Sequence, residues 1–176
     1  MLALDNDKAF EFYRSFLRWY CDWYKPTYLE IGCAGGSMTM TLNTAWAVGV
    51  DIESHADWDV YRKHRASIEF YKMTSDKYFE LYCNQGFGLV FIDGDHSKDQ
   101  VLKDTYNALN HLSEEGLICL HDTYPPDVGY THEQWSGTAY KAAIELRKDK
   151  SLEVYTFPVT YGLTLVSKIG QAFPWV

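Results

Sequence analysis

The chain has 176 residues, of which 47% are hydrophobic and 23% are charged, and its formal net charge is −8. This length and composition predict one globular domain spanning residues 1–176 and argue against a disordered chain. Because no apolar run approaches the roughly 20 residues of a membrane span, and because a nucleic-acid partner normally needs a basic surface, we expect neither membrane nor nucleic acid as a partner.

The N-terminus and the cysteines indicate where the protein works. The opening stretch, MLALDNDKAFEFYRSF, has neither a basic region nor a continuous apolar region, so we expect no secretion signal. The four cysteines lie at positions 21, 33, 83 and 119 without a CxxC pair. We interpret them as buried, reduced thiols, which is typical of a cytoplasmic protein.

Helical and strand patterns alternate along the chain. Aromatic residues at helical spacing predict a helix over 7–24, within an N-terminal region of 1–25, and Pro26 ends it. A core over 26–169 follows, with predicted strands at 28–32, 46–53, 67–73, 88–93 and 116–122 and predicted helices at 37–45, 57–65, 76–84, 98–112 and 138–149. Two last strands, LEVYTFPV and GLTLVSKI, are expected to form a hairpin.

This alternation predicts an α/β fold with a doubly wound, mostly parallel sheet and a C-terminal antiparallel hairpin. The strands are continuous apolar runs, as is typical of a parallel sheet covered on both faces. Ligands of such sheets bind beyond the carboxyl ends of the strands. Glu30, Asp51, Asp93 and Asp122 all fall at those ends, so the sequence predicts a ligand site there.

The first strand leads into a glycine-rich turn, YLEIGCAGGSMT. Gly32, Gly35 and Gly36 allow a backbone to approach a ligand closely, but their spacing is not GxGxxG, which disfavours a nicotinamide dinucleotide. A carboxylate at Glu30 would repel a pyrophosphate and would suit a ligand with a cationic end. Asp51 is placed to accept hydrogen bonds from a ribose diol. Together these residues predict S-adenosylmethionine as the cofactor.

Four motifs, LEIGCAGGSMT, VGVDIE, FIDGDHS and GLICLHDT, together resemble the class I S-adenosylmethionine-dependent methyltransferases, and within them the macrocin O-methyltransferase-like group. The resemblance implies a Rossmann-like sheet of seven strands, the last of them antiparallel. It also implies a cofactor lying over the first loop, with its ribose on Asp51 and its adenine near the start of the helix after the third strand. The implied residues are Glu30, Gly32, Cys33, Gly35, Gly36, Ser37, Asp51, Thr74, Ser75 and Asp76. For the last three, a plain helix cap is the alternative.

The resemblance also gives roles to the segment FIDGDHS and to the fifth strand. Asp93 and Asp122 match acids that bind a divalent cation, and oxygen ligands suit magnesium, which would activate a hydroxyl and align it with the methyl group. His96 matches the general base, so Asp93 and His96 are the expected catalytic residues. The alternatives are that His96 hydrogen-bonds a loop carbonyl, that Asp122 caps its strand and that Asp95 caps a turn or the following helix.

The residues beside Asp122 depart from the pattern of the resembling enzymes, and the role of the segment 124–137 stays open. His121 and Thr123 flank Asp122 where those relatives commonly carry a further acid, which weakens the expectation of a metal. The segment 124–137, YPPDVGYTHEQWSG, is long enough to form a lid. Its Tyr124, Tyr130, His132 and Trp135 either form an acceptor pocket or pack on the edge of the sheet.

The sequence therefore predicts a cytoplasmic O-methyltransferase that uses S-adenosylmethionine on a hydroxyl of a small molecule, such as a sugar or a natural product. A divalent cation, Mg²⁺, is a second cofactor if Asp93 and Asp122 bind it as the resemblance implies. The alternative is a catalytically silent binding or scaffold protein of the same fold, against which the set Asp93, His96 and Asp122 argues. The sequence is compatible with a homodimer and does not identify the acceptor.

Overall fold

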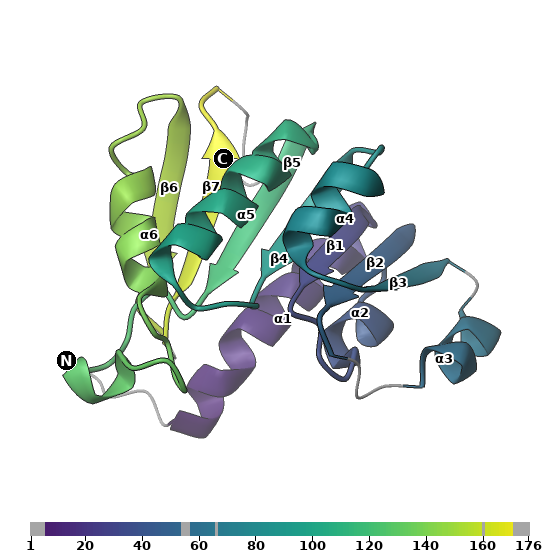
Figure 1. Cartoon of the computed structure of the whole chain (residues 1–176), viewed down its shortest axis with the longest axis horizontal. Helices are drawn as coiled ribbons and strands as arrows, with labels where there is room; N and C mark the ends of the chain where they lie inside the picture. The colour runs from purple at the N-terminus through teal and green to yellow at the C-terminus, as the bar shows by residue number, and fades with distance from the viewer. Residues whose placement is uncertain (1–5, 54–56, 66, 160, 171–176) are drawn as a thin grey trace.

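A computed structural model describes residues 6–53, 57–65, 67–159 and 161–170, with the side chains of 6–11 and 64 left aside (Figure 1). The strands are β1 Thr27–Ile31, β2 Trp46–Asp51, β3 Ile68–Lys72, β4 Phe87–Ile92, β5 Leu112–His121, β6 Leu152–Phe157 and β7 Leu163–Lys168. The helices are α1 Asn6–Tyr24, α2 Ser37–Thr41, α3 Trp58–His64, α4 Ser75–Leu81, α5 Lys98–Asn110 and α6 Ala139–Leu146, with a short 3₁₀ helix, η1, at Val128–Tyr130.

The seven strands form one sheet in the order β3-β2-β1-β4-β5-β7-β6. Strands β1 to β5 run parallel, whereas β7 pairs antiparallel with both β5 and β6. The predicted doubly wound sheet with an antiparallel C-terminal hairpin is therefore confirmed. The order of the strands reverses between β1 and β4, and ligands of such sheets bind in the crevice at that point.

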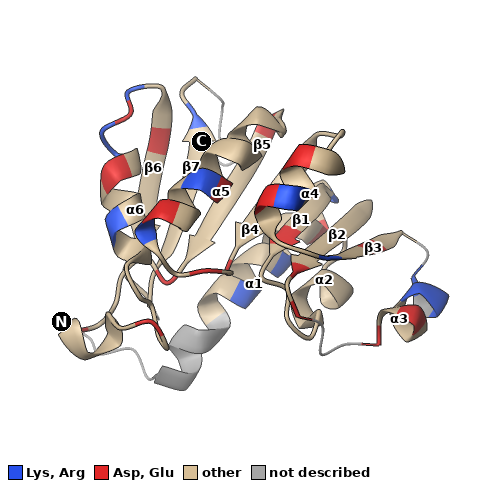
Figure 2. Ribbon diagram, in the orientation of Figure 1, with Lys and Arg blue, Asp and Glu red and all other residues tan. Residues whose placement is uncertain are grey.

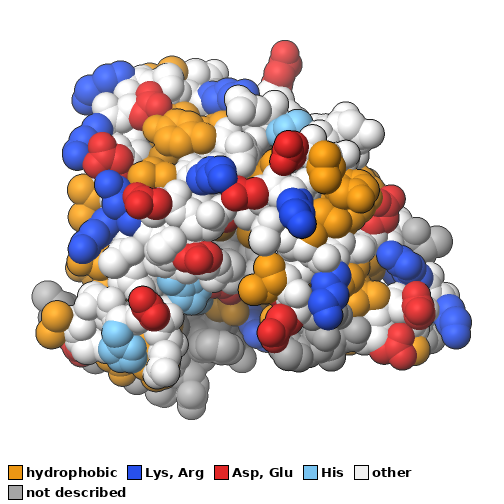
Figure 3. All heavy atoms as spheres, in the orientation of Figure 1, with side chains coloured by type: hydrophobic (Ala, Val, Ile, Leu, Met, Phe, Trp, Pro, Cys, Tyr) orange, Lys and Arg blue, Asp and Glu red, His pale blue; other side chains and the backbone are white. Residues whose placement is uncertain are grey.

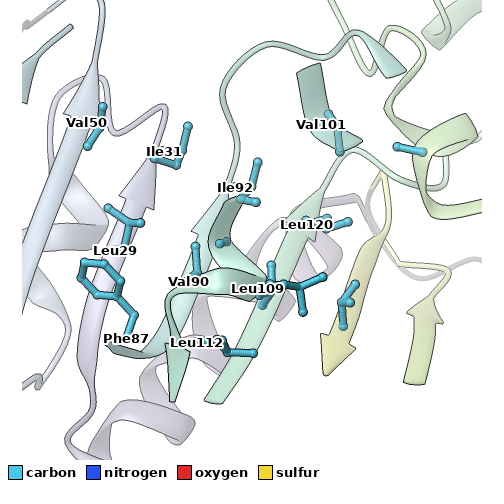
Figure 4. Packing of buried hydrophobic residues seen from close by; sticks show 14 of the residues in the cluster. Leu29, Ile31, Val50, Phe87, Val90, Ile92, Val101, Leu109, Leu112 and Leu120 are labelled. Carbon is cyan, nitrogen blue, oxygen red and sulfur yellow. The ribbon is translucent and has the colours of Figure 1, made fainter. Parts of the chain in front are cut away.

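Helices cover both faces of the sheet (Figure 1). One buried cluster joins the sheet to α4, α5 and α6, and Figure 4 shows its aliphatic side chains, such as Val90, Ile92 and Leu120, between strands and helices. A second cluster joins the other face to α1, α2 and α3 through residues such as Leu17, Met38 and Trp58. Apolar burial on both faces explains why the strand sequences show no alternation.

Four predicted helices extend too far by two residues or more, and those expected over 76–84 and 138–149 end at Leu81 and Leu146. The helix expected over 37–45 ends after Thr41, and Leu42 is extended with φ −75° and ψ 137°. The guanidinium of Arg65 donates to the carbonyl oxygens of Thr39, Leu42 and Thr44, which no longer accept bonds inside a helix.

The helix expected over 98–112 ends at Asn110, and Leu112 begins β5 opposite Phe87. Leu112 continues the apolar spacing of the helix, but the same residue also fits a strand, and pairing with β4 decides between them. Strand β5 thus starts earlier than predicted. It ends at His121, so Asp122 follows the strand, with a left-handed φ of 59°.

The cysteines are all unpaired, as expected for reduced thiols: Cys21, Cys33 and Cys119 are buried, and Cys83 is half-buried. Burial raises the pKa of Cys21 to about 12, which makes this thiol a poor nucleophile. Among the helices of the described residues, none is long and apolar enough to cross a membrane.

Candidate active site

A cleft of about 490 Å³ lies at the carboxyl ends of β1 to β4, where the strand order reverses. Several of the predicted cofactor residues line it, namely Gly32, Asp51, Thr74, Ser75 and Asp76, together with Asp93. Figure 2 shows acidic residues in several loops at this end of the sheet. The crevice expected from the topology therefore exists and is lined by residues at the ends of four strands.

Two glycines shape the first loop. Gly32 has φ +83°, and a Cβ there would lie 2.3 Å from the carbonyl oxygen of Asp93, so only glycine lets this loop lie against the loop after β4. Gly36 has φ +70°, and a Cβ there would lie 2.5 Å from the ring of Trp58. A Cβ at Gly35 would meet no atom of the described residues within 4 Å. Gly32 and Gly36 thus serve the packing of the loop.

Glu30 lies beneath this loop rather than in the cleft. Its side chain is buried, and the hydroxyl of Thr39 donates to its carboxylate. Burial raises the pKa of Glu30 to about 8, so it holds a proton at neutral pH. Of the other predicted cofactor residues, Cys33 and Gly36 are also buried, whereas Gly35 and Ser37 are exposed. These five residues are not among those that line the cleft.

Asp51 connects the first two loops. Its Oδ2 accepts a hydrogen bond of 2.7 Å from the backbone N–H of Ala34, and its Oδ1 accepts one of 2.9 Å from that of Glu53. Because the carboxylate is held from both sides and also lines the cleft, it is preorganised to accept further hydrogen bonds there.

Thr74, Ser75 and Asp76 lie at the end of the cleft near α4. Both interpretations of these residues, as a helix cap and as part of the cleft, apply there. Thr74 caps α4 by accepting from the N–H of Lys77, as in the helix-cap interpretation, yet it also lines the cleft. The side-chain amide of Gln100 lies 3.3 Å from both Ser75 Oγ and Asp76 Oδ1. Gln100 lines the cleft from α5, and no sequence motif marked it, because it lies in an ordinary amphipathic helix.

The predicted catalytic residues converge. Asp93, His96 and Asp122 each offer an atom within 4.8 Å of the others. Nε2 of His96 lies 3.3 Å from Oδ2 of Asp122 and 3.8 Å from Oδ1 of Asp93. The Asp93 carboxylate, followed in effect by that of Asp122, raises the pKa of His96 to about 8 against the opposing effect of burial.

The other ring nitrogen of His96, Nδ1, contacts the backbone carbonyl of Trp135. A carbonyl oxygen only accepts hydrogen bonds, so Nδ1 carries the hydrogen in the neutral ring and Nε2 is the basic nitrogen. The expected alternative, a hydrogen bond from His96 to a loop carbonyl, therefore holds for Nδ1. Nε2 faces the carboxylates of Asp93 and Asp122.

His121 is a member of this cluster, although the sequence marked it only as a neighbour of Asp122. Its Nδ1 lies 3.1 Å from Oδ1 of Asp93 and 3.0 Å from Oδ2 of Asp122. Burial opposes a charge on the ring, but the two carboxylates outweigh it and raise the pKa of His121 well above 6.5. Burial likewise opposes a charge on Asp93, yet His121 and then His96 bring its pKa down to about 2.

The segment 124–137 closes over the cluster. Ser136 is fully buried, and its hydroxyl donates to Oδ1 of Asp122 at 2.8 Å. The backbone N–H of Thr138 donates to the carbonyl of His96 at 2.8 Å. Gly137 has φ +51°, and a Cβ there would lie 2.7 Å from the same carbonyl oxygen. This segment therefore holds both the histidine and the aspartate.

A second cleft, of about 1050 Å³, lies between residues 94–97 and the stretch 131–138. Of the four aromatic or imidazole side chains expected to form an acceptor pocket, His132 lines this cleft. Tyr130 and Trp135 instead pack against each other and against Tyr161, with ring centroids 5.3 to 6.0 Å apart. Figure 3 shows acidic and histidine side chains near one another on the lower part of the face it presents.

The sequence matches the model of a family described as a methyltransferase domain over residues 29–123, which is more than half of the chain. No protein of curated function matches it significantly. Many solved structures share its fold. The SAH-bound methyltransferase PaMTH1 of Podospora anserina has a TM-score of 0.71 and 20% identity over 88% of this chain and 76% of that one.

Two O-methyltransferases share the fold over nearly the whole chain. TomG of Streptomyces achromogenes, solved in complex with SAM, has a TM-score of 0.64 and 16% identity over 97% of this chain and 92% of its own. An O-methyltransferase of Bacillus cereus in complex with SAH has a TM-score of 0.64 and 14% identity over 94% and 83%. The chain therefore belongs to the methyltransferase-domain family, and its fold is that of the class I S-adenosylmethionine-dependent methyltransferases.

Proposed function

We propose that the protein transfers a methyl group from S-adenosylmethionine to a hydroxyl of a small molecule, such as a sugar or a natural product. One observation carries this proposal: the cleft at the strand ends and the cleft under the segment 124–137 share Gly94 and Asp95, and His96 lies next to both. A base at the junction of two clefts is the arrangement that transfer between two bound molecules needs. The O-methyltransferase neighbours agree with this chemistry.

The chemistry of the first cleft fits this cofactor. Among the described residues that line it are five acids, Asp51, Asp76, Asp93, Asp95 and Asp104, and no Lys or Arg. Such a surface attracts positive charge and repels a pyrophosphate, which argues against a dinucleotide. When bound, S-adenosylmethionine would supply a methyl group on a positively charged sulfur. We assign its ribose to Asp51 and its adenine to the region of Thr74, Ser75 and Asp76.

The residues of the chain would act on the acceptor. The hydroxyl oxygen forms a bond to the methyl carbon while the carbon–sulfur bond breaks, and Nε2 of His96 takes the hydroxyl proton. The carbonyl of Trp135 keeps the hydrogen on Nδ1, so that the basic nitrogen faces the site. The carboxylates of Asp93 and Asp122 stabilise the positive charge that the ring then carries.

The predicted magnesium ligands, Asp93 and Asp122, fit a cation less well than they fit hydrogen bonds. Nδ1 of His121 lies within hydrogen-bonding distance of an oxygen of each acid, and neither neighbour of Asp122, His121 or Thr123, is a further carboxylate. The reaction that we propose therefore uses no metal ion.

The silent scaffold alternative is not favoured, because the acids and the histidine lie together rather than apart. The test is to incubate the protein with S-adenosylmethionine and a panel of hydroxyl compounds, and to measure S-adenosylhomocysteine and methylated product by mass spectrometry. Failure to bind S-adenosylmethionine, or tighter binding of NAD, contradicts the proposal. We also expect the protein to be cytoplasmic and to form a homodimer. Localisation in cells tests the first expectation, and analytical ultracentrifugation tests the second.

A further inference from the structure

The gap between Asp93 and Asp122 is where a cation shared by the two carboxylates would lie. Asp93 follows β4 and Asp122 follows β5, and these strands are neighbours in the sheet. In the structure, Nδ1 of His121 lies 3.1 Å from Oδ1 of Asp93 and 3.0 Å from Oδ2 of Asp122. Both distances are those of N–H···O hydrogen bonds. One ring nitrogen thus contacts an oxygen of each acid.

The ring of His121 is held in this place by packing as well as by the acids. Its side chain is only 9% exposed. The ring of Tyr13 lies 4.6 Å from it and the ring of Phe91 lies 6.2 Å from it, measured between centroids. The backbone of His121 pairs with Leu163 of β7. Rotation of the ring out of the gap would therefore disturb the core between α1 and the sheet.

The hydrogen on Nδ1 follows from the partners of the ring. Carboxylate oxygens only accept hydrogen bonds, so Nδ1 acts as the donor and has no lone pair left for a metal. The other nitrogen, Nε2, is buried and has no hydrogen-bond partner among the described residues. Coordination of a cation by Nδ1 would require this nitrogen to lose its hydrogen, and with it the hydrogen bonds to both carboxylates.

We propose that His121 takes the place of a divalent cation in this site: its Nδ1–H bridges Asp93 and Asp122 and positions them around His96 without a metal ion. His121 is thus a positioning residue. The inference concerns the site of the proposed methyl transfer and rests on that proposal for the role of His96. What it says about cations can be tested without any acceptor.

The experiment titrates Mn²⁺ into the full chain and follows free Mn²⁺ by electron paramagnetic resonance. For the unmodified protein we expect no saturable site up to millimolar Mn²⁺. His121→Asp replaces the bridging donor by a third carboxylate. We expect this variant to bind one Mn²⁺ at least about tenfold more tightly than the unmodified protein does. The added substitution Asp93→Asn should abolish this gain, whereas Asp99→Asn, which removes an exposed acid nearby on α5, should not.

Saturable one-to-one binding of Mn²⁺ to the unmodified protein, lost in Asp93→Asn, would overturn the inference. So would a folded His121→Asp variant, verified by circular dichroism, that gains no binding. If that variant does not fold, the titration of the unmodified protein decides alone. Calorimetric titration of S-adenosylmethionine in the same samples reports separately on the proposed function, because that molecule is assigned to the first cleft.

Discussion

His96 has two ring nitrogens with different surroundings, and this difference gives the residue its proposed role. Nδ1 is bound to the carbonyl of Trp135, which lies 39 positions away in the sequence, while Nε2 faces the carboxylates. A free histidine on a loop would exchange its tautomers and orientations. The backbone contact removes that freedom, so that a basic nitrogen points in one direction.

Replacing His96 tests this role directly. His96→Ala should lower the turnover number by about 10²–10⁴-fold, the usual contribution of a general base. The affinity for S-adenosylmethionine should change little, because His96 is not among the residues that line the first cleft. Steady-state kinetics and calorimetry measure the two quantities. Near-normal turnover in this variant would leave His96 only a structural role.

The acids beside His96 should appear in the pH dependence. A base must start unprotonated, and the pKa of His96 is raised to about 8, so turnover should rise with pH through about 8 and level off above it. Asp122→Asn removes one of the charges that raise this pKa, so the rise should move to lower pH. A profile that stays at the same pH in this variant would contradict the assignment.

Asp51 is the residue through which the cofactor can be tested. Asp51→Ala should weaken binding of S-adenosylmethionine by about 1.5–3 kcal/mol, because a charged acceptor at the cleft is lost. Part of the loss would come from the first loop, whose Ala34 N–H is held by the same carboxylate. Asp51→Asn, which keeps an acceptor oxygen for that N–H, should lose less. Calorimetric titration compares the three proteins.

At the scale of elements, the loops rather than the strands build the site. The loop after β1 lies against the loop after β4, with Gly32 facing the backbone of Asp93. The segment between β5 and α6 binds Asp122 through Ser136 and His96 through backbone groups. Each side chain with a proposed catalytic role is therefore positioned by at least two elements, which limits its motion.

The first loop offers a matched pair of variants. Gly32→Ala should lower the free energy of unfolding by about 1–3 kcal/mol or more, because its φ is +83° and the new Cβ would meet the carbonyl oxygen of Asp93. Gly35→Ala should be close to neutral, since its Cβ would meet no atom within 4 Å. Denaturant unfolding measures both. Equal losses in the two variants would show that the packing of Gly32 has no special importance.

On the scale of the whole molecule, the sheet places several acids at one end, and Glu30 is among the carboxyl groups that are buried. Glu30 is buried, and burial raises its pKa from 4.5 to about 8. The folded state therefore keeps a proton that the unfolded chain releases at lower pH. Stability from this group is fully present below pH 4.5 and is lost as the pH rises through about 8.

This linkage predicts a measurable loss of stability as the pH rises from mildly acidic to mildly alkaline values. Without cofactor, the free energy of unfolding should fall between about pH 5 and pH 8, by an amount on the order of a few kcal/mol. Glu30→Gln keeps the shape and an acceptor for the hydroxyl of Thr39, and should reduce that fall. The raised pKa values of His96 and His121 should leave a fall above about pH 6.5 in both proteins. Denaturant unfolding across the pH range compares the two proteins. The same slope in the variant would contradict a protonated Glu30.

The sequence by itself determined the fold class and the end of the sheet at which the site lies. Continuous apolar runs indicated a parallel sheet, and acids after those runs indicated the ligand edge, because both signals depend on residues close together in the chain. Asp51, Asp93 and Asp122 were predicted in this way, whereas the role predicted for His96 came from the resemblance to the methyltransferases. The end of α5 was not, because the apolar Leu112 fits a helix and a strand equally well.

Only the tertiary structure decided which side chains touch. That Glu30 lies beneath the loop, that Gln100 reaches the cleft and that Ser136 holds Asp122 all depend on elements meeting across the sheet. His121 shows this most clearly, since its place in the sequence marks it as a neighbour of Asp122 and says nothing of Asp93, 28 positions away. Pairing of β4 with β5 brings the two acids together, and packing of α1 holds the imidazole between them.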